Sequence, residues 1–354
     1  METALSVTAI MKRTASALLH RSGILQMAAL FLRHVPRILM YHRFEEQPGG
    51  MWPCQELLEQ QIRYLTRHYR VLSLDQLHRA LISGGVPDNT VTLTIDDGYE
   101  DFYRIAFPIL RKYRVPATLY VTTDFVDRRM WFWWDTVRFI LNRTPNRVLT
   151  FPAGGQTRTF ELTLDSERQA AWSAIGTVCL TLHGPARQRL LATVADNLGV
   201  SVPEAPTSEY RPVTWSQVRE MADAGIEIGS HTCSHLRLSL ASKVELAREL
   251  VESKRRLEDV TGREVRSFCY PFGRPEDLNE TVRGAVVDAG YCSAVVAYND
   301  SRITDDLFAL RRFSVGTDMT GFRRIVCGTN LASAQLKRYV TWSPTASASA
   351  PGAS

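Results

Sequence analysis

The sequence predicts an α/β fold, a distorted (β/α) barrel with a helical insertion, and three observations support this prediction. Short apolar runs alternate with helical patterns along most of the 354 residues, which is typical of strands that are each followed by a helix. Ionisable residues directly follow several of these runs, as they do at the carboxyl ends of barrel strands. No glycine-rich turn follows the first predicted strand, which argues against a dinucleotide-binding sheet.

The first half of the chain supplies three predicted strands and two helices. We expect strands at residues 37–41, 91–95 and 117–121, because these are apolar or alternating runs. A helix is expected at residues 55–67, and a second helix follows the middle strand and ends near residue 111. Since a helix lies between successive strands, the strands are expected to be parallel.

The second half repeats the same unit with clear helix signals. Capping boxes open two helices, one formed by Thr214 and Gln217 and the other by Ser242 and Glu245. Glycines close the predicted helices. The strands between them are expected at residues 226–229, 265–270 and 291–296.

Residues 129–210 interrupt this rhythm and are predicted to be an insertion. They contain an aromatic-led helix, a hairpin around Gly154 and Gly155, and helices between residues 166 and 198. The regular alternation of one strand with one helix is therefore absent from the pattern predicted for this part of the chain.

The two ends of the chain are expected to lie outside the barrel. Residues 1–35 are predicted to contain a basic amphipathic helix that could contact the inner face of a membrane. A helix packed on the domain, or a frayed leader, is the favoured interpretation because the polar face is weak. Residues 36–338 form the main domain. Residues 339–354 are expected to be disordered, because the sequence from Ser343 onward has nothing to bury.

The composition of the chain limits which partners and which cellular compartment are expected. The formal net charge is +5 and the arginines form no long basic block, so no nucleic-acid partner is expected. The six cysteines include no Cys-x-x-Cys pair, so neither a disulfide scaffold nor a cysteine zinc site is predicted. No cleavable signal is evident, which predicts a cytoplasmic protein, peripheral at the inner membrane face if the N-terminal helix binds lipid.

Ionisable residues at two predicted strand ends indicate the chemistry. Asp96 and Asp97 follow the strand at residues 91–95, and His231 and His235 follow a later one. One carboxylate and two imidazoles bind a divalent transition metal and leave positions open for water and substrate. Adjacent buried acids are costly unless a cation compensates them. Taken alone, the first motif could be a turn with a helix N-cap and the second a surface histidine pair; together they predict a metal-dependent hydrolase.

Four motifs, in the order and spacing of one family, support this hypothesis. Residues 94–98 (TIDDG) and 231–235 (HTCSH) resemble the first two motifs of the polysaccharide deacetylase family. Residues 268–273 (FCYPFG) resemble its third motif, and residues 39–43 (LMYHR) resemble the first-strand signature of its bacterial, exopolysaccharide-associated branch within carbohydrate esterase family 4. The resemblance implies that family's barrel. It also implies removal of N-acetyl groups from an N-acetylated sugar or glycan precursor in surface polysaccharide biosynthesis.

The resemblance also implies a role for each matching residue. Asp96 is expected to be the general base. Asp97, His231 and His235 are expected to hold one divalent metal ion, zinc first, with cobalt, nickel, manganese or iron also fitting the donor set. The third motif is expected to contact the substrate and, through the backbone N–H of Phe272, to stabilise the oxyanion; its predicted residues are Tyr270, Pro271 and Phe272.

The chain departs from the family pattern at two positions. Cys269 stands where many members carry an arginine that orients the catalytic aspartate, and no histidine follows His235 to act as the late general acid. His42, at the end of the first predicted strand, is the substitute candidate for the acid, with a structural histidine as the competing interpretation. Arg312 is a weaker candidate for steadying Asp96, and an ordinary surface arginine is its favoured interpretation.

The aromatic run at residues 131–134 (WFWW) and the nature of the substrate each allow more than one interpretation. A Trp-rich start of a helix is more often packed core than a sugar-binding or membrane-interface surface, so core is the favoured interpretation. The expected partner is a carbohydrate, either an N-acetylated glycan or a lipid-linked precursor. Two further functions compete with this one: an amidohydrolase acting on a small non-sugar amide, and a catalytically weak glycan-binding protein.

Overall fold

The structure is a computed structural model, and it describes residues 30–300 and 302–329 of the chain. Most of the predicted N-terminal helix and all of the predicted tail lie outside the described residues, so the membrane contact stays a prediction. Among the helices within the described ranges, none combines the length and the hydropathy needed to cross a bilayer.

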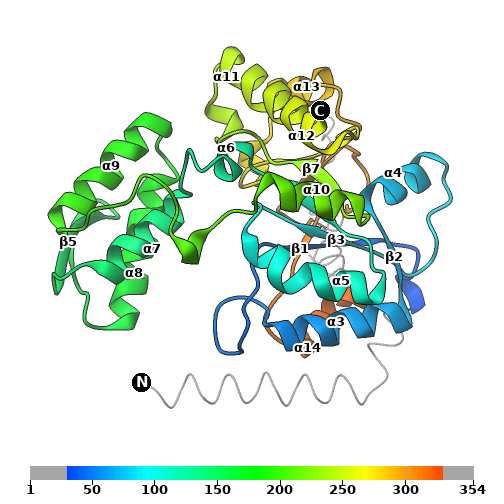
Figure 1. The fold of residues 1–354 in the computed structure, drawn as a ribbon, viewed down its shortest axis with the longest axis horizontal. Coiled ribbons are helices and arrows are strands. Elements are labelled where there is room, and N and C mark those ends of the chain that lie inside the picture. Colours follow the sequence, from blue (N-terminus) through cyan, green and yellow to red (C-terminus); the bar gives the residue numbers. More distant parts are fainter. Residues whose placement is uncertain (1–29, 301, 330–354) are drawn as a thin grey trace, which may run out of the picture.

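Parallel strands form a nearly closed barrel at the centre of the molecule (Figure 1). Its order is β10-β9-β8-β7-β4-β3-β1-β11, and β2 pairs with β3 beside this path. The predicted fold class is confirmed. The strands are β1 (Arg37–Tyr41), β2 (Arg70–Leu72), β3 (Thr90–Ile95), β4 (Thr118–Val121), β7 (Glu227–Ser230), β8 (Ser267–Cys269), β9 (Ser293–Val296), β10 (Leu310–Arg311) and β11 (Phe313–Ser314).

One short stretch of chain closes the barrel. β10 and β11 are separated by a single residue, Arg312, and they pair with opposite ends of the sheet. Leu310 lies opposite Val295 of β9, whereas Phe313 lies opposite Leu39 of β1. Residues 310–314 therefore join the first strand of the barrel to the last.

The helices around the barrel begin where the sequence signals predict. Thr214 and Ser242 each accept a hydrogen bond from the third residue of the helix that follows, and the Gln217 and Glu245 side chains complete both capping boxes. The barrel helices are α3 (Gln55–His68), α4 (Leu74–Ile82), α5 (Phe107–Tyr113), α6 (Thr123–Val126), α10 (Trp215–Asp223), α11 (Lys243–Ala247), α12 (Ser253–Thr261), α13 (Glu280–Asp288) and α14 (Met319–Val326).

Two π-helical turns adjoin these helices. One turn (Phe102–Ala106) precedes α5, and the other (Arg248–Glu252) joins α11 to α12. A π turn adds one residue to a helical turn and redirects the side chains around it, and such turns are frequent at functional sites.

A helical unit with its own core lies beside the barrel, on the left in Figure 1. We call it the α7–α9 unit; it comprises α7 (Trp133–Arg143), the hairpin of β5 (Val148–Ala153) and β6 (Gln156–Glu161), α8 (Asp165–Cys179) and α9 (Gly184–Asn197). Its buried residues, including Val137, Phe160 and Ile175, form a cluster separate from the barrel core. The predicted insertion boundaries, 129 and 210, stay a prediction.

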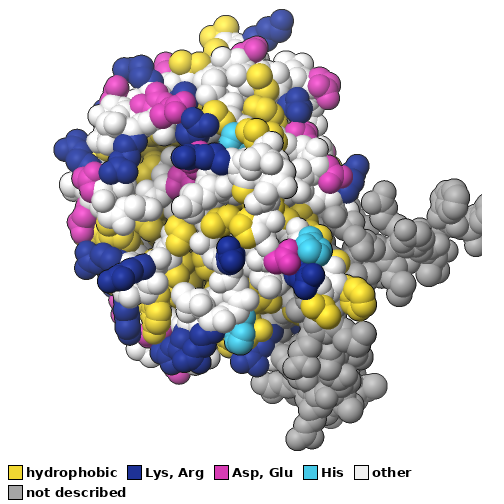
Figure 2. All heavy atoms as spheres, turned by 90° about the vertical axis from the view of Figure 1, so that its right-hand side faces the viewer, with side chains coloured by type: hydrophobic (Ala, Val, Ile, Leu, Met, Phe, Trp, Pro, Cys, Tyr) yellow, Lys and Arg dark blue, Asp and Glu magenta, His cyan; other side chains and the backbone are white. Residues whose placement is uncertain are grey.

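Charged side chains are mixed over the surface on the other side of the barrel. Figure 2 views the molecule from the side opposite the α7–α9 unit, and Lys and Arg side chains lie there among Asp, Glu and apolar ones. This distribution agrees with a sequence in which the basic residues form no long block.

Candidate active site and metal centre

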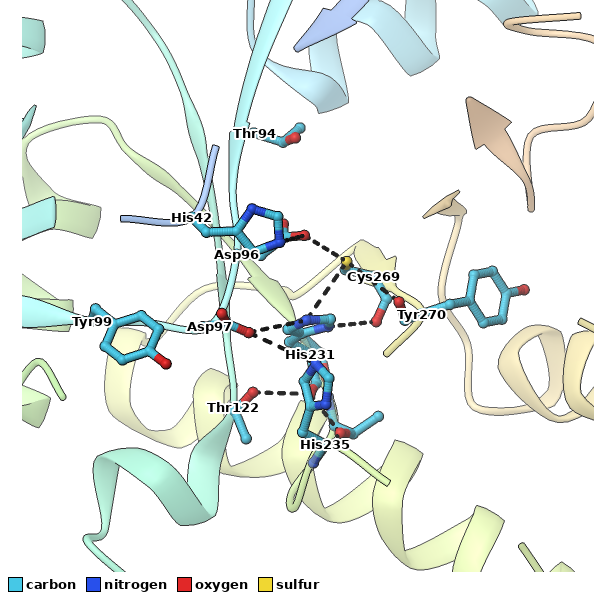
Figure 3. Close-up of polar contacts among 12 residues, drawn as sticks. His42, Thr94, Asp96, Asp97, Tyr99, Thr122, His231, His235, Cys269 and Tyr270 are labelled. Atoms are coloured by element: carbon cyan, nitrogen blue, oxygen red, sulfur yellow. Dashed lines mark hydrogen bonds and ion pairs between the residues drawn. The ribbon is translucent and has the colours of Figure 1, made fainter. Parts of the chain in front are cut away.

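The ends of the barrel strands bring the predicted site residues together (Figure 3). His42 follows β1, Asp96 and Asp97 follow β3, and His231 follows β7. His235 lies four residues further along the same loop as His231. The four strongest candidates, Asp96, Asp97 and the two later histidines, are all buried.

Asp97, His231 and His235 converge on one point. The Asp97 Oδ1 atom lies 3.5 Å from His231 Nε2 and 3.8 Å from His235 Nε2, and the ligand atoms of all three lie within 4.8 Å of one another. Atoms bound tetrahedrally about 2.1 Å from one ion lie about 3.4 Å from each other. The spacing and the donor set therefore fit a divalent metal ion.

Local backbone geometry and hydrogen bonds hold this group in place. Asp97 and His235 have φ angles of 78° and 53°, a left-handed conformation that side-chain-bearing residues adopt at a cost. The His231 Nδ1 atom lies 2.8 Å from the backbone carbonyl of Cys269. If Nδ1 carries the proton, Nε2 is free to bind a metal.

Aromatic rings orient the second histidine. His235 Nδ1 is buried and has no hydrogen-bond partner among the described residues. Instead, the rings of Trp134, Phe272 and Phe132 meet the imidazole nearly edge to face, with centroids 5.1, 4.9 and 5.4 Å away. Burial lowers the pKa of His235 to about 3. The imidazole is therefore neutral at ordinary pH, as a metal ligand must be.

Glu249, which no sequence motif indicates, supports the histidine loop. Its buried carboxylate accepts hydrogen bonds from the backbone N–H groups of Cys233 and Ser234, at 2.9 and 2.8 Å, and from the Ser234 hydroxyl at 2.7 Å. Glu249 lies in the π-helical turn between α11 and α12. The sequence predicts one continuous helix there, and nothing in its apolar pattern signals that turn.

The prediction that Arg312 is an ordinary surface arginine is wrong. It is 2% exposed. Its two Nη atoms donate to the two carboxylate oxygens of Asp96 at 2.6 and 2.7 Å, and its Nε donates to the Val296 carbonyl at 3.0 Å. The reason is that Arg312 interrupts the closing strand, so its side chain enters the barrel rather than solvent. It occupies the orienting role that the weaker hypothesis gave it.

The Asp96–Arg312 pair sets the charge of the predicted base. Burial acts to raise the pKa of Asp96, but the Arg312 guanidinium outweighs burial and holds that pKa well below its ordinary value. Cys269 packs against the pair, with its Sγ 3.2 Å from Arg312 Nη2 and 3.5 Å from Asp96 Oδ2. Asp96 is therefore ionised over the whole neutral pH range.

His42 lies beside the predicted base. Its Nε2 is 3.8 Å from Asp96 Oδ2, its side chain is 32% exposed, and its ring lies 6.0 Å from that of Trp52. In Figure 3 the imidazole lies next to Asp96, while Asp97 faces the other two histidines. This position is accessible to a substrate, as a proton donor to a leaving group must be.

The three residues predicted for the third motif differ in position. Phe272 has a φ of 60°, lines the cleft described below, and its N–H donates to no acceptor among the described residues. The Tyr270 hydroxyl instead donates to the Phe308 carbonyl at 3.0 Å, and Figure 3 shows its ring turned away from the histidines. Pro271 is buried and is not among the residues that line the cleft. Tyr270 and Phe272 both line the cleft, and Phe272 has the N–H group that the predicted oxyanion role requires.

These residues open into a cleft of about 700 Å³ between the mouth of the barrel and the α7–α9 unit. Phe132 is 1% exposed and belongs to the packed core, as predicted, whereas Trp133 and Trp134 are half-buried: each packs against a core cluster and also lines the cleft. The helical spacing alone could not show which ring faces a cavity. The aromatic residues of the cleft are Phe44, Trp52, Tyr99, Trp133, Trp134, Trp172, Tyr210, Tyr270 and Phe272.

A family model described as polysaccharide deacetylase matches residues 83–148 and 181–294, which together make up just over half of the chain. The chain belongs to the polysaccharide deacetylase family. The predicted family and the predicted class of enzyme, a deacetylase hydrolase, are thereby confirmed. The residues between the two matched segments contain the β5–β6 hairpin and α8.

Individual relatives are distant. The chain is 22% identical to the Bacillus subtilis protein YxkH over 287 residues, which cover 80% of this chain and 72% of that protein. It is 27% identical over 247 residues to the poly-beta-1,6-N-acetyl-D-glucosamine N-deacetylase of Escherichia coli K12. That match covers 68% of this chain but only 31% of the longer enzyme.

The fold of this polysaccharide deacetylase is also found in solved structures. A deacetylase of Streptococcus pyogenes, PplD, whose structure contains acetate, aligns with a TM-score of 0.54 and 20% identity over 87% of this chain and 98% of that one. At this identity the likeness concerns the barrel fold alone, so the roles of Asp96, His42 and Arg312 depend on the geometry described above.

Proposed function

We propose that the protein is a metal-dependent N-deacetylase that hydrolyses the acetamido group of an N-acetylated amino sugar in a glycan or glycan precursor. The observation that carries this proposal is the convergence of Asp97, His231 and His235 beside the arginine-paired carboxylate of Asp96. A metal-ligand group and an ionised base at the floor of one open cleft are what amide hydrolysis by water requires.

The proposed mechanism assigns a task to each residue. A divalent ion held by Asp97, His231 and His235 would polarise the acetamide carbonyl and make a nearby water more acidic. Asp96 accepts a proton from that water as its oxygen bonds to the carbonyl carbon. The free N–H of Phe272 donates to the developing oxyanion. His42 then protonates the nitrogen as the C–N bond breaks, which releases acetate and leaves the sugar amine.

The cleft supports a sugar substrate over a small non-sugar amide. Its volume of about 700 Å³ and its aromatic walls are typical of sites that enclose a ligand of several ring-sized units. The Escherichia coli relative is named for a poly-N-acetylglucosamine substrate, and we propose a substrate of that class in surface polysaccharide assembly. A lipid-linked substrate and a cytoplasmic, membrane-peripheral location stay predictions.

The hypothesis of a catalytically weak glycan-binding protein loses its main support. That hypothesis rested on the arginine missing from position 269 and on the missing late histidine. Arg312 binds Asp96 through two hydrogen bonds, and His42 lies within 3.8 Å of the same carboxylate. Arg312 is therefore suitably placed to orient Asp96, and His42 is suitably placed to act as the general acid.

Acetate release tests the proposal. The purified full chain is stripped of metal and incubated with β-1,6-linked N-acetylglucosamine oligomers, with and without added zinc, cobalt, nickel, manganese or iron. We expect acetate only when a metal is added, and a loss of about a thousandfold in Asp96→Asn. Oligomer binding without turnover at any of these metals would instead indicate a glycan-binding protein, and a preference for small cyclic amides would indicate an amidohydrolase.

A further inference from the structure

A second group of polar side chains lines the cleft and has no task in the mechanism above. Asp135 belongs to α7, and Tyr99 belongs to the loop that follows β3. The Tyr99 hydroxyl donates to Asp135 Oδ2 at 2.6 Å, and the Trp134 indole N–H donates to the same hydroxyl at 3.0 Å. This chain of hydrogen bonds ties the α7–α9 unit to the catalytic end of the barrel.

Asp135 has fewer partners than a buried carboxylate needs. It is 4% exposed, and its carboxylate accepts one hydrogen bond from the described residues, the one from Tyr99. Two arginines of the cleft wall are engaged elsewhere: Arg43 pairs with Asp101 at 2.9 Å and lies over the Tyr99 ring at 4.3 Å, and Arg138 lies over the Trp172 ring at 5.6 Å. A buried carboxylate with a single neutral partner is costly unless further donors reach it.

The surroundings of Asp135 indicate what those donors are. The residue lies next to Trp134 in sequence, and both line the cleft. Trp133 and Trp172 extend the same apolar wall, with ring centroids 6.5 Å apart. A mostly apolar site with one oriented acceptor suits a ligand that has apolar faces and hydroxyl donors. Sugars combine these two features.

We infer that Asp135 is a substrate-recognition residue whose carboxylate accepts hydrogen bonds from hydroxyl groups of the amino sugar, with the Trp134 indole as the adjoining apolar surface. This inference rests on the proposed function and assigns sugar recognition to helix α7. It also gives the α7–α9 unit a task, because α7 carries both residues to the metal centre, where Trp134 already contacts His235.

The test compares two substrates that share an acetyl group. Asp135→Asn keeps the shape of the side chain but removes its charge, and Asn142→Ala changes an exposed residue of the same helix outside the cleft. One substrate is an N-acetylglucosamine oligomer and the other is an aryl acetate without sugar hydroxyls. We expect Asp135→Asn to lower the ratio of kcat/KM for the oligomer to that for the ester by about ten- to a hundredfold. The loss should arise mainly in KM, and Asn142→Ala should leave the ratio unchanged.

A second variant distinguishes sugar binding by Asp135 from a role of Asp135 in positioning Tyr99. If Asp135 merely holds Tyr99 in place, Tyr99→Phe should reproduce the whole effect of Asp135→Asn, because it removes the same hydrogen bond. If Asp135 binds the sugar, Tyr99→Phe keeps the carboxylate and should lower the ratio much less. Equal losses in the two variants, or equal losses on the two substrates in Asp135→Asn, would overturn the inference.

A binding measurement separates this inference from the proposed function. Calorimetry with the oligomer is carried out on Asp96→Asn, with and without Asp135→Asn, so that no turnover is needed. Weaker binding in the double variant supports recognition by Asp135 even if the wild-type protein releases no acetate. Equal affinities in the two proteins would overturn recognition by Asp135 even if acetate release is confirmed.

Discussion

Arg312 and Asp96 form a buried ion pair, and this pair sets the charge of the proposed base. A carboxylate in this position without its guanidinium would be a buried, unpaired charge, and breaking such a pair costs about 3–5 kcal/mol. Lysine cannot replace arginine here, because it offers no planar fork for both carboxylate oxygens and no Nε donor for the Val296 carbonyl.

Replacing Arg312 is expected to change the pH dependence of the reaction. In Arg312→Gln the pKa of Asp96 should rise, because burial then acts without the opposing guanidinium. A higher pKa means that the base is protonated up to a higher pH, so the acid limb of the kcat/KM profile should move to higher pH. Thermal unfolding should show a stability loss of about 3–5 kcal/mol. An unchanged acid limb would contradict the role of Asp96 as base.

We expect His42 to act as the proton donor and His235 to act as a metal ligand. His42→Ala should lower kcat by about a hundredfold or more while the metal content, measured by mass spectrometry, stays unchanged. His235→Ala should instead bring the bound metal to well below one ion per chain, because it removes one of three converging donors. Loss of metal in His42→Ala would show that this residue is a ligand, not the acid.

Among the secondary-structure elements, the π-helical turn between α11 and α12 has the clearest link to the site. Glu249 lies in this turn, and its buried carboxylate accepts hydrogen bonds from three donors of the histidine loop. Its effect on the metal is therefore indirect, through the backbone that carries His235.

Glu249→Ala is expected to weaken metal binding without removing a ligand. Loss of a residue that orients a metal ligand typically costs about ten- to a hundredfold in metal affinity, and titration of stripped protein with a zinc-competing dye measures it. The control is Glu252→Ala, in the same turn, whose side chain is 58% exposed and pairs with Arg248. Equal metal affinities in the two variants would contradict the supporting role of Glu249.

For the whole molecule, buried carboxyl groups are expected to make stability fall with rising pH. Burial raises the pKa of Asp101 to about 6 and that of Asp135 to about 7, compared with about 4 in the unfolded chain. Between these values the folded protein binds protons that the unfolded chain does not, so these two carboxyl groups contribute stability near pH 4 that is lost as the pH rises to about 7. The depressed pKa of Asp96 acts in the opposite direction only below about pH 4. The lowered pKa of His235 acts in the opposite direction between about pH 3 and pH 6.5.

Melting temperatures between pH 4 and 8 test this expectation. Between pH 4 and pH 8 the melting temperature of the wild-type protein should fall relative to that of Asp135→Asn, because the variant has no carboxyl group at that position. A pH profile of Asp135→Asn parallel to that of the wild type would show that this carboxyl does not titrate as its burial implies.

The sequence predicts the barrel and the proposed metal ligands because both depend on local patterns. Asp96, Asp97, His231 and His235 each follow an apolar run directly or within a few residues, and parallel strands place such ends together. The burial of Arg312 cannot be predicted in this way, because it depends on a strand that pairs with both ends of the sheet, which no local pattern encodes. The same holds for the contacts of Glu249 with a loop 15 and 16 residues away in the chain, and for Trp134, which faces a cavity formed with another unit.

The position of Arg312 in the closing strand also has a consequence for protein synthesis. A nascent chain that has left the ribosome only as far as residue 300 already contains the three proposed metal donors, but it lacks residues 310–314, which join the sheet edges. Hydrolytic competence should therefore arise late in translation, when the guanidinium reaches Asp96. A polypeptide released before that point could bind metal without turning over substrate.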